Sequence, residues 1–69
     1  MNARQAVEKN EELTNDLFNS SKEMAIRLNI TIEEAINKKV AIYIKNAKSN
    51  NEAAAWDIRG ENAKKKINA

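Results

Sequence analysis

The chain has no cysteine, no histidine and no proline, and its single glycine is Gly60. Without thiolates or imidazoles it lacks the usual ligands of structural zinc and the usual nucleophile and base pairs of covalent catalysis. Without cysteine it also cannot be stabilised by a disulfide bond. We therefore expect no enzyme activity, no metal and no cofactor, and we look for a function among binding proteins.

Long apolar runs are missing as well. No stretch approaches the roughly 18 consecutive apolar residues that a membrane span needs. The opening sequence, MNARQAVEKNEE, lacks the apolar core of a signal peptide. We expect a cytoplasmic protein that has no membrane partner.

The length and the charge bear on the choice of partner. A chain of 69 residues forms one domain at most and buries only about 60% of the surface that its unfolded form exposes. We therefore expect a partner chain, either a second copy or another protein, to add stability. The 12 basic and 10 acidic residues give a net charge of +2, which is too small to argue for nucleic-acid binding by itself.

Small and apolar residues recur along the first part of the chain at alternating spacings of four and three. They are Ala3, Val7, Asn10, Thr14, Leu17, Ser21, Met24 and Leu28. This spacing predicts one amphipathic helix over residues 3–28. Polar residues within such a seam are typical of helices whose partners are specified at some cost in stability. The seam therefore indicates helix pairing.

The segment after this seam has two interpretations. Large apolar residues at positions 26, 28, 30 and 32 alternate with polar residues, as in a strand with one buried face. However, Thr31 followed by Glu34 forms a helix-starting capping box, and Asn29 suits a left-handed turn. We favour a helix, a tight turn and a second helix, with the strand as the alternative.

The rest of the chain contains two further helix signals. The second helix starts at Ile32 and has a wide apolar face. Ser49 and Glu52 indicate the start of a short third helix that ends at Gly60, and the alternative is a second helix that continues through this segment. The predicted fold is thus all-α, with two long helices in an antiparallel hairpin, a short third helix and self-association. We expect a helical domain over residues 1–60 and a basic flexible tail over residues 61–69.

The wide face of the second helix, together with the region of the only tryptophan, is our candidate protein-binding surface. An aromatic side chain near an arginine is a frequent interface anchor. The residues are Ile36, Val40, Tyr43, Ile44, Trp56 and Arg59. The predicted function is that of a small non-enzymatic protein-binding or regulatory module that associates with itself or with a partner protein.

The alternative is a small dimeric DNA-binding repressor of the ribbon-helix-helix or helix-turn-helix type. In the strand interpretation Arg27, Asn29 and Thr31 would face the major groove, where Arg and Asn side chains read base edges. A basic run near the end of the chain would add contacts to phosphates. The candidate nucleic-acid-binding residues are Arg27, Asn29, Lys64, Lys65 and Lys66.

One segment resembles a known family. The stretch ELTNDLFNSSKEMAIRLNITIEEAINKK, residues 12–39, is similar to a helix pair of the all-α nucleotide pyrophosphohydrolases. The resemblance implies that Glu12 and Asp16 stand at positions of metal-binding carboxylates. It covers less than half of the chain, and the earlier carboxylate-bearing helices of that family have no counterpart here. We therefore interpret Glu8, Glu12 and Asp16 as a solvated acidic face and assign no metal site.

Overall fold

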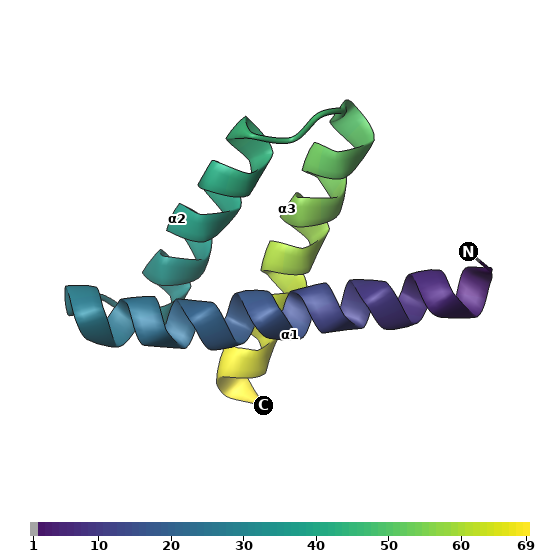
Figure 1. Cartoon of the computed structure of the whole chain (residues 1–69). Helices are drawn as coiled ribbons and strands as arrows, with labels where there is room; N and C mark the ends of the chain where they lie inside the picture. Colours follow the sequence, from purple (N-terminus) through teal and green to yellow (C-terminus); the bar gives the residue numbers. More distant parts are fainter. Residues whose placement is uncertain (1) are drawn as a thin grey trace.

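The computed structural model describes residues 2–69, and this part of the chain contains three α-helices and no strand. The helices are α1 (Ala3–Leu28), α2 (Ile32–Lys45) and α3 (Asn50–Lys65), and a short 3-10 turn, η1 (Lys66–Asn68), follows them. The all-α prediction is confirmed. Figure 1 shows α2 and α3 side by side with α1 lying across both. This arrangement does not confirm the antiparallel hairpin that we expected of the first two helices.

The two ends of α1 are fixed by local hydrogen bonds. At the start, Gln5 N donates to Asn2 Oδ1 (2.9 Å) and Asn2 N donates to Gln5 Oε1 (3.0 Å). At the end, Asn29 adopts the left-handed conformation, and Ile30 N donates to Ala25 O at 3.0 Å. Asn29 N also donates to Ile26 O, which completes a Schellman motif. The backbone around Ile26 is thus satisfied by helix and turn, and the strand interpretation is wrong.

The next two helix starts follow the capping signals. Thr31 Oγ1 accepts a hydrogen bond from Glu34 N (3.0 Å) at the start of α2. Ser49 Oγ accepts one from Glu52 N (3.1 Å) at the start of α3. The Glu52 carboxylate accepts from Lys48 N (2.6 Å), one residue earlier than in a standard capping box. The prediction of a separate third helix is confirmed.

The predicted end of the third helix at Gly60 is wrong. The α3 helix continues to Lys65, so it is slightly longer than α2. Gly60 is buried within the helix, and a Cβ atom built on it would lie 2.7 Å from Val40 Cγ2. The glycine permits a close approach of α3 to α2 and does not form a cap. Because Ala63 is fully buried, residues 61–65 belong to the packed domain, and a tail cannot start at 61.

The core lies where the three helices meet. Leu17 from α1, Ile36 from α2 and Ala63 from α3 are almost completely buried. Five partly buried apolar residues pack around them: Phe18, Ile32, Val40, Tyr43 and Trp56. The buried residues of α1 are the seam residues Thr14, Leu17 and Ser21, together with the adjacent Ala25. The first two turns of α1 are exposed, and Figure 1 shows them extending past α3.

One buried polar atom has no partner. The hydroxyl of Ser21 is fully buried and makes no hydrogen bond, whereas the neighbouring Ser20 Oγ donates to Leu17 O at 3.2 Å. An unsatisfied buried hydroxyl costs about 1–3 kcal/mol. We therefore expect Ser21→Ala to raise the free energy of unfolding by about 1 kcal/mol, as measured by urea denaturation followed by circular dichroism.

Ser20→Ala is the matched control. Both substitutions exchange serine for alanine inside α1, so the gain in helix propensity is the same. Only Ser20 loses a hydrogen bond, and its gain should therefore be smaller by at least about 0.5 kcal/mol. Equal gains in the two variants would show that the Ser21 hydroxyl is not an unsatisfied group.

Candidate protein-binding surface

The predicted binding residues on α2 are mostly used inside the molecule. Ile36 is completely buried, and Val40 and Tyr43 pack on the core from its edge. Ile44 is the exception, because 37% of it is exposed. The prediction that Ile36 contacts an outside partner is wrong, because α1 and α3 both pack against α2.

Trp56 and Arg59 form a cluster with residues of the other two helices. The Trp56 ring stacks on Tyr43, with ring centroids 4.3 Å apart and an interplanar angle of 25°. The Arg59 guanidinium lies over the Trp56 ring, with Cζ 4.6 Å from the centroid. Arg59 Nε also donates to Asn10 Oδ1 at 2.7 Å. The polar seam residue Asn10 therefore pairs within its own chain, and Arg59 links α3 to α1.

The structure separates the candidate DNA-binding residues. Asn29 lies in the turn between α1 and α2, and Arg27 lies in the last turn of α1. Lys64 is half-buried at the end of α3, with its Nζ 3.4 Å from Glu61 Oε1, whereas Lys65 and Lys66 are exposed. Figure 1 shows the end of α3 well apart from the turn. Because the described part of the chain has no strand, a ribbon that places Arg27, Asn29 and Thr31 in a groove is wrong.

Several large apolar side chains are exposed instead. They are Val7, Ile26, Leu28, Ile42, Ile44, Ile58 and Ile67. Ile26 is the most exposed of these, at 84%, because it lies on the side of α1 opposite the buried seam. Exposed apolar side chains are ordinary when they occur singly, and they become informative when they adjoin one another.

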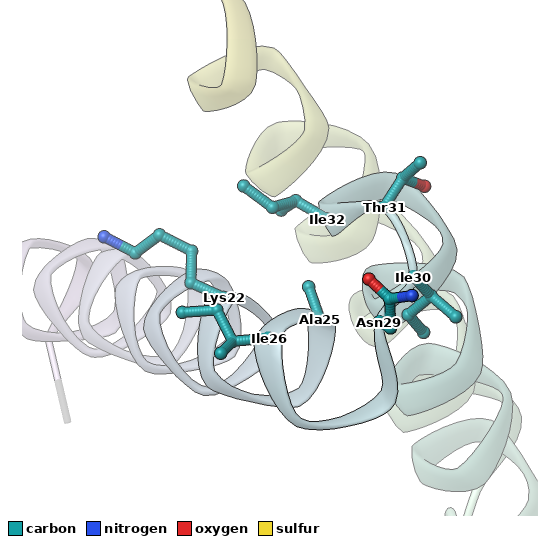
Figure 2. Close-up of a pocket in the computed structure, with 7 residues that line it drawn as sticks. All are labelled: Lys22, Ala25, Ile26, Asn29, Ile30, Thr31 and Ile32. Atoms are coloured by element: carbon teal, nitrogen blue, oxygen red, sulfur yellow. The ribbon is translucent and has the colours of Figure 1, made fainter.

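Ile26 adjoins other apolar residues at the junction of α1 and α2. An open hollow of about 590 Å³ is lined there by Lys22, Ala25, Ile26, Asn29, Ile30, Thr31 and Ile32. Figure 2 shows these side chains arranged around the hollow, from the last turns of α1, the turn itself and the start of α2. We call these seven residues the α1–α2 corner. Its walls are largely apolar, and its one charged group is the Lys22 amine, 4.9 Å from the Phe18 ring centroid.

Sequence reasoning missed this corner. Ile26 was the one apolar residue of its segment that did not fit the helical seam, and this misfit was the available signal. A large apolar side chain on the polar side of a helix does not contact the helices that pack on the opposite, apolar side. Ile30 and Ile32 line the same hollow only because the chain turns at Asn29 and enters α2.

The carboxylates of α1 form no comparable site. Glu8, Glu12 and Asp16 are all exposed, and Glu8 and Glu12 form surface ion pairs with Arg4 and Lys9. Residues 2–69 contain no group of three or more histidine, cysteine, aspartate or glutamate side chains that is arranged to hold a metal ion. None of the described helices is long and apolar enough to span a lipid bilayer. Comparison of the chain with protein-family models, with characterised proteins and with solved structures finds no match.

Proposed function

We propose that this chain is a small non-enzymatic protein-binding module that acts by helix-mediated association with itself or with a partner protein. The observation that carries the proposal is Ile26, which is 84% exposed beside an apolar hollow. Burying an isoleucine side chain contributes about 1.5–3 kcal/mol relative to leaving it in water. Adjoining exposed apolar residues on a small protein mark interaction sites.

The chemistry of the corner supports binding and no reaction. Its polar groups are the Lys22 amine, the Asn29 amide and the Thr31 hydroxyl, and the hydroxyl already caps α2. No general base stands beside a nucleophile there. The surface that we propose therefore differs from the one expected from the sequence, and it lies on the turn between α1 and α2.

A crosslinking experiment tests the proposal. Because the chain has no cysteine, Ile26→Cys creates a unique attachment point for a benzophenone label at the corner. We expect illumination of the labelled protein, purified or in a lysate of the source organism, to give one protein adduct of defined mass whose yield saturates with concentration. The adduct mass identifies the partner as a second copy or as another protein.

Asn19→Cys is the matched control for this label. Asn19 is exposed on the same helix and lies outside the corner. It should give no saturable adduct under the same conditions. Equal adducts from both positions, or none from either, would refute the proposal.

The rival function, a DNA-binding repressor of the helix-turn-helix type, has a test of its own. Basic contacts to phosphates make the affinity fall steeply as salt rises. We expect a gel-shift assay with random duplex DNA at two salt concentrations to show no salt-dependent complex. A complex that is lost at the higher salt concentration would support the rival.

A further inference from the structure

The chain exposes more surface than a compact protein of its mass. Its accessible surface is 5079 Å², whereas the empirical relation for folded monomers gives about 4,400 Å² for 7.8 kDa. The excess is about 700 Å², the difference between these values, and a standard interface buries about 800 Å² on each partner. The flat shape of the molecule, 39 × 27 × 15 Å, accounts for the excess. A further layer of protein packed against this molecule would bring the accessible surface per unit mass to the value expected of a compact protein.

The corner contains the most exposed large apolar side chain of the described residues. Ile26 is 84% exposed, compared with 58% for Val7 and 59% for Ile58. Ile26 also has Ile30 and Ile32 as neighbours around the same hollow. A partner that enters the hollow would therefore cover the exposed Ile26 and reach the remaining accessible surface of the partly buried Ile30 and Ile32.

Side chains of opposite charge lie beside the corner. Lys22 lies on the α1 side, and Glu33 and Glu34 begin α2 directly after Ile32. Within residues 2–69, none of these three side chains forms an ion pair. Two copies placed face to face about a two-fold axis exchange their edges. An axis that brings the Lys22 amine of each copy opposite the acidic first turn of α2 in the other would favour this partner in this orientation.

We infer that the partner at the α1–α2 corner is a second copy of this chain, in a symmetric dimer in which Ile26 of each copy packs beside Ile30 and Ile32 of the other. This inference rests on the proposed function and names its partner. Lys22 of each copy pairs with Glu33 or Glu34 of the other copy at the rim.

Sedimentation equilibrium of the full chain, from about 5 µM to about 1 mM, tests the inference. We expect a monomer–dimer equilibrium whose dissociation constant rises about tenfold or more in Ile26→Lys, because this change places a charge at the centre of the contact. Val7→Lys is the matched control. It also replaces a β-branched aliphatic side chain with lysine on the same helix, at an exposed position outside the corner. It should leave the dissociation constant within about twofold.

A charge-reversal pair tests the orientation. Lys22→Glu should weaken the dimer, and a mixture of Lys22→Glu with a Glu33→Lys, Glu34→Lys chain should form the mixed dimer in preference to either homodimer. A chain that stays monomeric at every concentration, or a dimer that Val7→Lys weakens as much as Ile26→Lys does, overturns the inference. A monomer whose position-26 label still gives a saturable adduct with a different protein ends the second-copy inference and leaves the proposed function standing.

Discussion

Trp56→Ala is expected to leave much of the chain unfolded at room temperature. The Trp56 ring stacks on Tyr43 of α2, supports the Arg59 guanidinium and packs on the central core. Truncating a packed tryptophan costs about 3–5 kcal/mol. A chain of this length has a total stability of roughly 3–10 kcal/mol at about 0.05–0.15 kcal/mol per residue. Thermal unfolding followed by far-ultraviolet circular dichroism should show a much lower midpoint and a broad transition.

Two further variants isolate the role of the ring. Trp56→Phe keeps an aromatic face for Tyr43 and should lose much less stability than Trp56→Ala. Ile58→Ala removes a large apolar side chain from the same helix at an exposed position, and it should change the free energy of unfolding by less than about 0.5 kcal/mol. If Trp56→Ala and Ile58→Ala unfolded at the same temperature, the stacked pair would not hold α2 and α3 together.

Gly60→Ala is expected to destabilise the protein, although the same change stabilises most exposed helices. Exchanging glycine for alanine inside a helix normally gains about 1 kcal/mol. Here the new Cβ would lie 2.7 Å from Val40 Cγ2, and a valine on a helix has almost no alternative rotamer. Overpacking of this kind costs about 1–3 kcal/mol. We expect a net loss of up to about 2 kcal/mol in urea denaturation once the propensity gain is included.

A double-mutant cycle shows whether the Val40 methyl group causes this loss. Val40→Ala alone should destabilise the protein by creating a gap, and the Gly60→Ala, Val40→Ala pair should fill part of that gap. The pair should then be at least about 1 kcal/mol more stable than the sum of the single changes predicts. Additive losses would mean that α3 moves away from α2 at no cost, and our account of Gly60 would be wrong.

The parts of this fold that the sequence predicts are those set by local signals. The first helix has the predicted bounds because its seam and its turn at Asn29 lie within one continuous segment. The starts of α2 and α3 follow from Thr31 and Ser49 for the same reason. Capping bonds span three residues, so neighbours along the chain are sufficient to identify them.

The parts that were missed depend on residues far apart in the chain. From the sequence, Gly60 is expected to end a helix. Only its short distance to Val40 shows that it lies where α3 packs against α2. Arg59 binds Asn10 across 49 positions, and neither residue indicates its partner by spacing. The corner was missed because it forms only after the chain turns at Asn29 from α1 into α2. Each of these three features therefore depends on packing between separate helices.

Each ion pair of the described residues joins two side chains of the same helix. Arg4 with Glu8, Lys9 with Glu12, and Lys64 with Glu61 each lie within a single helix. The contacts between helices are apolar packing, ring stacking and the hydrogen bond from Arg59 to a neutral amide. Added sodium chloride screens interactions between exposed charges, with a Debye length of about 10 Å at 0.1 M, and leaves apolar packing and ring stacking almost unchanged. We therefore expect ionic strength to leave the packing of the three helices almost unchanged, and in the proposed dimer to act on the pairs of Lys22 with Glu33 or Glu34.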